Sequence, residues 1–205
     1  MPNALRLYGV TSNDHGHAKP ADGAELLPFR ELAALVTPSE YTVATPTGET
    51  IEKHRHVVDA MFSHAAVLPA PVGTVFRSRE TLLRWLELHY VALTEALNFV
   101  DDRTVARVHV RRADEREDDR DTGSDLAAAA AESLRALRRQ SVATVPLKSE
   151  HLTGIVLSSA FLLDKELWGD FVNALEEQRS KHEGLVFDLS GPWPPFDFVR
   201  MQFGG

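Results

Sequence analysis

The sequence predicts an α+β protein with two units. Apolar residues recur at helical spacing in some segments and alternate as in strands in others. Hydrophobic residues make up 43% of the 205 residues and charged residues 25%, the ordinary mixture of a globular protein. The length allows one large domain or two small ones. A long helical pattern that ends near Asp101 favours two, with an N-terminal α/β unit at residues 1–101.

The first elements of this unit are short strands followed by a helix. Leu5–Val10 is typical of a strand, and residues 26–36, split by Pro28, predict one or two more. Apolar residues at helical spacing predict an amphipathic helix over residues 49–65, and Thr47 is its expected cap.

The rest of the unit combines a proline-rich segment with a long helical pattern. Residues 67–76 contain Pro69 and Pro71, which remove backbone donors, so this segment predicts at most a bent or edge strand. Ser78 is the expected cap of a helical pattern that runs to Asp101.

The second half predicts alternating strands and helices. Val108 and Val110 alternate with Arg107 and His109, as expected for a strand with one buried face. In chain order we expect a strand at 104–111, a helix that begins at Ser124, strands at 144–147 and 153–163, a helix at 164–184 with Asp164 as its cap, and a strand at 185–190. This is the βαββαβ order of a ferredoxin-like sandwich, assigned to residues 102–190. Residues 191–205 form an aromatic and proline-rich C-terminal tail.

Composition limits the possible functions. The 22 Lys and Arg against 30 Asp and Glu give a net charge of -8, the wrong sign for a nucleic-acid partner. Cysteine is absent, which excludes disulfides, thiolate metal sites and thiol nucleophiles. No segment reaches the roughly 18 consecutive apolar residues of a membrane span, and we expect a cytoplasmic protein.

Motifs for catalysis and for cofactors are missing from the sequence. It contains no Gly-x-Ser-x-Gly, Walker or dinucleotide-binding pattern. His15 and His17 lie in one loop but make a weak metal pair, and His54 and His56 would face different sides of a helix. We therefore expect no catalytic, cofactor-binding or metal-binding residues, and no enzyme activity.

Four segments carry a resemblance to a known family. They are Leu5–Val10, Val67–Phe76, Ala160–Lys165 and Gly184–Val199, and the last contains the most specific element, Gly-Pro-Trp-Pro-Pro-Phe at 191–196. In this order they resemble the GvpL/GvpF family of gas vesicle proteins. The resemblance implies a non-enzymatic accessory or minor structural protein, located with gas vesicles, that binds the hydrophobic shell protein and other accessory proteins and assists gas vesicle assembly.

This chain departs from the family pattern at two places. Pro71 and Val72 stand where the family usually has Arg and Phe, and the acidic run 114–121 replaces a basic helix start. The choice of partner is expected to differ accordingly. The acidic run is most simply a solvated loop, with attraction of a basic accessory protein as the alternative.

Partner contacts are expected in the proline-rich segment and in the tail. The candidate residues are Val67, Leu68, Val75, Phe76, Trp193, Phe196 and Phe198. The first four belong to an edge-like segment suited to β-augmentation. The tail aromatics either pack back onto the two units, which we favour, or form a docking strip. The rival function is a ferredoxin-like ligand-binding or enzymatic domain with no gas vesicle role.

Overall fold

The computed structural model describes residues 3–15, 20–42, 45–113, 120–148 and 154–199. The chain divides into two compact units. Unit 1 comprises Met1–Asp101 together with Pro194–Gly205, and unit 2 comprises Asp102–Trp193. Unit 1 is therefore built from two separate stretches of the chain, and unit 2 is inserted between them.

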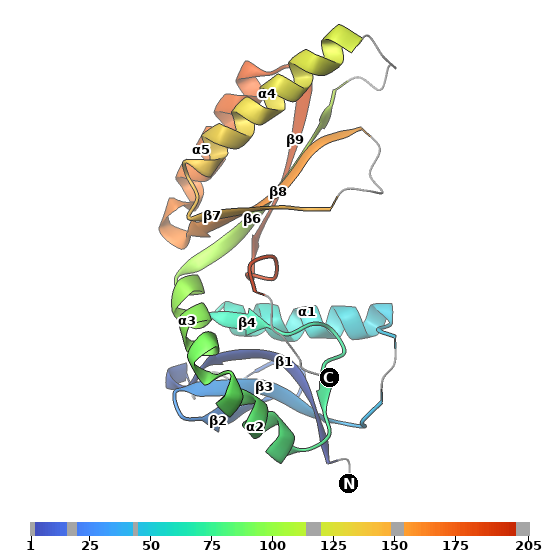
Figure 1. The fold of residues 1–205 in the computed structure, drawn as a ribbon, viewed down its shortest axis with the longest axis vertical. Helices are drawn as coiled ribbons and strands as arrows, with labels where there is room; N and C mark the ends of the chain where they lie inside the picture. Colours follow the sequence, from blue (N-terminus) through green and yellow to red (C-terminus); the bar gives the residue numbers. More distant parts are fainter. Residues whose placement is uncertain (1–2, 16–19, 43–44, 114–119, 149–153, 200–205) are drawn as a thin grey trace. The chain divides into compact units, whose positions relative to one another are not determined.

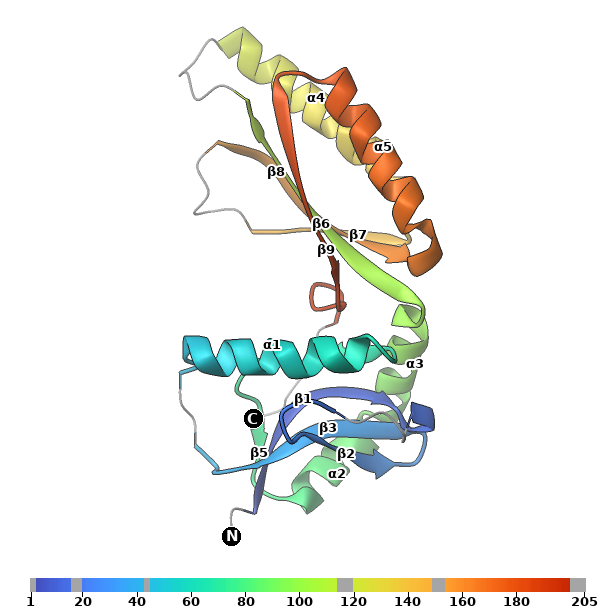
Figure 2. The ribbon, with the colours of Figure 1, turned by 180° about the vertical axis from the view of Figure 1, so that it is seen from behind.

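Unit 1 contains an antiparallel sheet. Its strands are β1 (Ala4–Ser12), β2 (Glu25–Phe29), β3 (Leu32–Ser39), β4 (Val67–Pro69) and β5 (Val75–Phe76), and a 3-10 turn, η1 (Asn13–His15), follows β1. The strand order is β2-β3-β1-β4, and β5 also pairs with β1. Seen from behind, β5 runs along β1 (Figure 2). The segment expected as a bent or edge strand thus forms two short strands along one edge of the sheet.

Helices cover both faces of this sheet. Helix α1 (Gly48–Phe62) packs on one face, where Val57, Val58 and Met61 join Tyr8 of β1 in a buried cluster. Helices α2 (Arg79–Leu88) and α3 (Tyr90–Val100) pack on the other face, against Leu7 and its neighbours (Figure 1). Unit 1 is therefore a three-layer arrangement.

The single helical pattern expected from Ser78 to Asp101 is two helices. Ser78 caps α2 as expected, through a reciprocal capping box with Thr81. The helix then breaks at His89, whose φ of -104° and ψ of 10° are not helical. Because α2 and α3 both contribute to the same buried cluster, the break allows each to present its own apolar side to the sheet.

Unit 2 is a four-stranded antiparallel sheet with two helices. In chain order its elements are β6 (Arg103–Arg112), α4 (Arg120–Arg138), β7 (Ala143–Pro146), β8 (Ile155–Asp164), the 3-10 turn η2 (Lys165–Leu167), α5 (Trp168–Lys181) and β9 (Leu185–Trp193). The strand order is β7-β8-β6-β9. Val108 and Val110 are fully buried in a cluster with Phe161 and Phe171, as their alternation predicts.

Three details of unit 2 differ from expectation. Helix α4 begins at Arg120, four residues before the expected start at Ser124, so it includes the last two residues of the acidic run expected to be a loop. Asp164 makes no capping hydrogen bond, and its Oδ1 instead accepts one from Nε of Arg103, at 2.9 Å, while η2 leads into α5. The last strand does not end at Ser190 but continues through Gly191, Pro192 and Trp193, which the sequence pattern assigns to the tail. Residues 114–119 of the acidic run, and His17 of the weak metal pair, lie outside the described residues.

Candidate partner-contact surfaces

Val67 and Leu68 lie in the core of unit 1. Both have no exposed surface, because β4 is packed between β1 and the helices. The main chains approach closely here: a Cβ added at Gly9 would lie 2.7 Å from the carbonyl oxygen of Leu68. Neither residue is therefore available to a partner, because main chain and side chain are both buried.

Val75 and Phe76 are partly buried in β5. The Phe76 ring lies 5.6 Å from the Trp85 ring and packs against the cluster beneath α2 and α3. A tight turn precedes β5, in which Thr74 donates from its Oγ1 to the carbonyl of Pro71 at 2.7 Å. Gly73 has a φ of 87°, which favours glycine. The exposed Pro71, one of the two departures from the family pattern, is the first residue of this turn, and its carbonyl accepts from both the amide and the hydroxyl of Thr74.

Trp193 is partly buried at the end of β9. Its Nε1 donates to Oγ of Ser190 at 3.2 Å, and its carbonyl accepts from Oγ1 of Thr104 at 3.2 Å. Gly191 is required nearby: its φ is 132°, and a Cβ there would lie 2.6 Å from the carbonyl oxygen of Val105. The indole is thus held within unit 2.

The residues after Trp193 pack within unit 1. Phe196 lies against the buried cluster of α1, and Val199 lies against the cluster of α2 and α3. Two short turns hold this segment, with the amides of Phe196 and Phe198 bonded to the carbonyls of Pro194 and Pro195. Phe198 is partly buried. Met201 and Phe203 of the tail lie outside the described residues.

Among the residues whose burial is described, the most exposed large apolar side chains lie at the junction of α2 and α3. Leu88 is 78% exposed and Val91 is 66% exposed, and we call this pair the α2–α3 corner. Sequence reasoning missed it, although a signal was present. Both residues fall outside the stripe of Leu82, Leu86, Leu93 and Leu97 that faces the core.

His54 of α1 is a titratable group buried in the core of unit 1. It is only 2% exposed, its ring lies 5.3 Å from the Tyr8 ring, and neither ring nitrogen has a hydrogen-bond partner of good geometry. Burial lowers the pKa of His54 to about 4; the backbone of Ala70 opposes this effect and the charge of Arg6 adds to it. The ring is neutral at physiological pH.

The described ranges contain no group of three or more His, Asp or Glu side chains that could hold a metal ion. None of the helices within them combines the length and the apolar character that a membrane crossing demands.

The fold is similar to that of two solved gas vesicle proteins. The structure is similar to crystal structures of the gas vesicle protein GvpF from Anabaena sp., with a TM-score of 0.81 and 14% identity, and from Microcystis aeruginosa, with a TM-score of 0.74 and 12% identity. The matches cover 98% and 97% of this chain and all of each of those chains. The fold is thus that of gas vesicle proteins of the F type.

Sequence comparison gives the family. The model described as "Gas vesicle synthesis protein GvpL/GvpF" matches residues 4–128 and 106–200. Gas vesicle protein F2 of Halobacterium salinarum is 26% identical over 210 residues, covering 98% of this chain and 94% of that protein. Gas vesicle protein F1 of the same organism is 24% identical over 220 residues, covering 100% of this chain and 96% of that protein. The chain belongs to the GvpL/GvpF family, which confirms the resemblance seen in the sequence and implies a role in gas vesicle formation.

Proposed function

We propose that this chain is an accessory or minor structural protein of gas vesicles. It binds the hydrophobic shell protein and other accessory proteins in the cytoplasm and assists assembly by non-covalent contact, without enzymatic chemistry. The observation that carries the proposal is the match to the GvpL/GvpF family along almost the whole chain, supported by the fold likeness over both units.

The physical requirements of such a helper agree with the properties of this chain. A gas vesicle wall must present an apolar face to gas, so its subunit is prone to aggregate before assembly. A helper needs an apolar surface for docking and must itself stay dissolved. The α2–α3 corner offers the first, and the net charge of -8 favours the second.

We place the shell-protein contact at the α2–α3 corner and along β5. Val75 and Phe76 remain candidates because both are only partly buried, whereas Val67 and Leu68 have no exposed surface to offer a partner. Trp193, Phe196 and Phe198 are assigned first to packing, since contacts within the protein already cover much of their surface.

We also propose that residues 102–193 form a ferredoxin-like domain. Its support is the element order β6–α4–β7–β8–α5–β9 together with the sheet order β7-β8-β6-β9. The fold alone decides no function, so the gas vesicle role does not rest on this assignment.

Co-expression with a gas vesicle shell protein tests the proposed function. We expect the shell protein to stay in the soluble fraction and to co-purify with this chain. The double variant Leu88→Gln/Val91→Gln should retain several-fold less shell protein, because it removes the apolar corner and preserves the helices. Ile51→Gln is the matched control, since Ile51 is 47% exposed on α1.

The possible results distinguish a wrong function from a wrong contact surface. If the wild-type chain never associates with shell protein, the helper role is wrong. If the double variant binds as well as the wild type and the control, the role stands and the α2–α3 corner is not the contact surface.

A further inference from the structure

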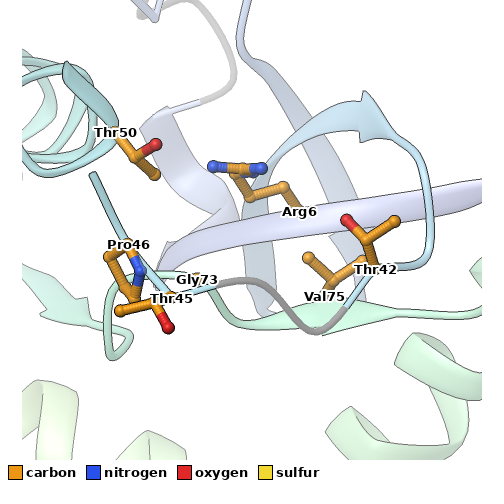
Figure 3. Close-up of a pocket in the computed structure, with 7 residues that line it drawn as sticks. All are labelled: Arg6, Thr42, Thr45, Pro46, Thr50, Gly73 and Val75. Carbon is orange, nitrogen blue, oxygen red and sulfur yellow. The ribbon is translucent and has the colours of Figure 1, made fainter.

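A small pocket opens on unit 1 beside β1. Its volume is about 40 Å³, and it is lined by Arg6, Thr42, Thr45, Pro46, Thr50 and Val75, with Gly73 at its wall (Figure 3). The lining residues come from β1, from the segment before α1, from the first turn of α1, and from the segment that ends in β5. Figure 3 shows the Arg6 side chain rising from β1 with its guanidinium turned toward Thr50.

Arg6 stands on a sheet face that is otherwise packed. The residues on either side of it, Leu5 and Leu7, pack in the cluster beneath α2 and α3. Because side chains alternate along a strand, Arg6 faces the opposite side, toward α1. Its charge is felt there by the buried His54. Arg6 is thus a partly buried cation at the end of an apolar face.

This guanidinium has no protein counter-charge among the described residues. Within those ranges, the Arg6 side chain takes part in no ion pair and no hydrogen bond, although its main chain pairs in the sheet. Glu40 and Glu49 flank the pocket in the sequence, but both are exposed and neither pairs with Arg6. A guanidinium has five N–H donors, and its partial burial without an acceptor is unfavourable unless an anion or water satisfies them.

The rest of the pocket complements a small oxyanion. Thr42, Thr45 and Thr50 supply hydroxyl groups, and the Thr50 hydroxyl is already oriented by the Thr47 hydroxyl at 2.9 Å. A second cation, Arg77, lies 4.9 Å above the ring of Tyr41, the residue before Thr42.

We propose that this pocket binds a carboxylate carried by a protein partner, namely an Asp or Glu side chain of an acidic segment. The Arg6 guanidinium donates two parallel hydrogen bonds to the two carboxylate oxygens, and the threonine hydroxyls donate to the same carboxylate. Pro46 and Val75 pack against the methylene stem of the side chain, a contact that a free inorganic anion cannot make. The small volume of the pocket, about 40 Å³, matches a single side-chain carboxylate. The site is separate from the α2–α3 corner, and the inference does not require shell-protein binding there.

An NMR titration of the ¹⁵N-labelled full chain tests this site. The probes are the peptide acetyl-Ala-Glu-Ala-amide, its Gln counterpart and inorganic phosphate. We expect the Glu peptide to cause saturable shifts at the Arg6 Nε–H and at the amides of Thr50 and Gly73. The Gln peptide should bind about tenfold more weakly, because it lacks the charge-assisted pairing.

Variants show whether the guanidinium is responsible. Arg6→Gln should abolish the chemical-shift changes. Arg6→Lys should weaken them, because lysine keeps the charge but cannot make the two-point hydrogen bond of a guanidinium. Arg84→Gln, at an exposed position on α2, should leave them unchanged. The amide spectrum and the melting temperature report folding of each variant, and Arg6→Lys provides the comparison if Arg6→Gln fails to fold.

Three results would overturn the proposal. The first is the lack of any saturable shift with the Glu peptide, and the second is an equal response of Arg6→Gln or Arg6→Lys and the wild type. The third is tighter binding of inorganic phosphate than of the Glu peptide, which would identify the ligand as a free anion and not a side chain.

Discussion

Replacing His54 by leucine should change how stability depends on pH. The imidazole is buried beside Tyr8 in the core under α1, and its two nitrogens have no partner of good geometry. Leucine fills a similar space without polar atoms. At pH 7.5, where the wild-type ring is neutral, His54→Leu should be as stable as the wild type or more stable, because no buried polar atom is left unpaired.

The magnitude follows from the pKa of His54. It is about 4 in the folded protein and 6.5 in the unfolded chain. Between these values the unfolded state binds a proton that the folded state does not, so stability falls as the pH falls. One pKa unit corresponds to 1.36 kcal/mol, and the free energy of unfolding should therefore drop by about 3 kcal/mol from pH 6.5 to pH 4. The contribution of His54 becomes constant about one pH unit above 6.5, where the unfolded chain has also lost the proton.

Urea denaturation at a series of pH values, followed by circular dichroism, measures this effect. The difference between wild type and His54→Leu isolates one group, which matters because Asp59 on the same helix has a pKa raised by burial and contributes with the opposite sign. His56→Gln, at an exposed position two residues away, should keep the wild-type slope. If His54→Leu keeps that slope as well, the ring is not held neutral in the folded protein and the reasoning is refuted.

Three further predictions concern the C-terminal region. Gly191→Ala should lower the free energy of unfolding by at least about 2 kcal/mol, because its φ is 132° and the new Cβ would lie 2.6 Å from the Val105 carbonyl oxygen. Gly169→Ala in α5 is the control, because a Cβ there meets nothing within 4 Å; it should leave the free energy of unfolding unchanged or raise it by up to about 1 kcal/mol. Equal effects of Gly191→Ala and Gly169→Ala in urea denaturation would contradict this account. Phe196→Ala should lower it by roughly 1–3 kcal/mol, less than a fully buried phenylalanine, because the ring packs against the α1 cluster but is only partly buried. Ending the chain after Ser190 should lower the melting temperature more than Phe196→Ala does, since the end of β9 is lost as well. If neither Phe196→Ala nor the shortened chain changes the melting temperature, the C-terminal tail serves docking alone.

The elements that sequence reasoning predicts well are those whose pattern is local. The alternation around Val108 and the apolar spacing of α1 depend only on which side of an element is buried, and both are visible in the residues themselves. Ser78 is recognisable as a helix cap because its partner, Thr81, is three residues away.

The features that sequence reasoning misses depend on residues far apart in the sequence. Asp164 looks like a helix cap, but its partner Arg103 is 61 residues away. The break at His89 is not marked by a glycine or proline in the sequence. It follows from the packing of α2 and α3 on one sheet. The burial of Val67 and Leu68 could not be predicted either, since a proline-rich apolar segment fits an exposed edge as well as a covered one.

The candidate site shows the same division. The family is recognisable from short segments such as Gly-Pro-Trp-Pro-Pro-Phe, which are continuous in the sequence. The pocket around Arg6 was not predictable, because its lining comes from four segments that no spacing rule connects. The exposure of Leu88 and Val91 was partly predictable, because the helical spacing places both residues outside the apolar stripe that faces the core.

The insertion of unit 2 within unit 1 has a consequence for the order of folding on the ribosome. Residues 1–101 emerge first, but Phe196 and Val199, which pack against the two core clusters of unit 1, are made only after all of unit 2. The first unit to leave the ribosome is therefore the last to complete its core. Until then, part of the apolar surface under α1 lacks its native cover, and a chain interrupted anywhere before residue 196 carries an unfinished first domain.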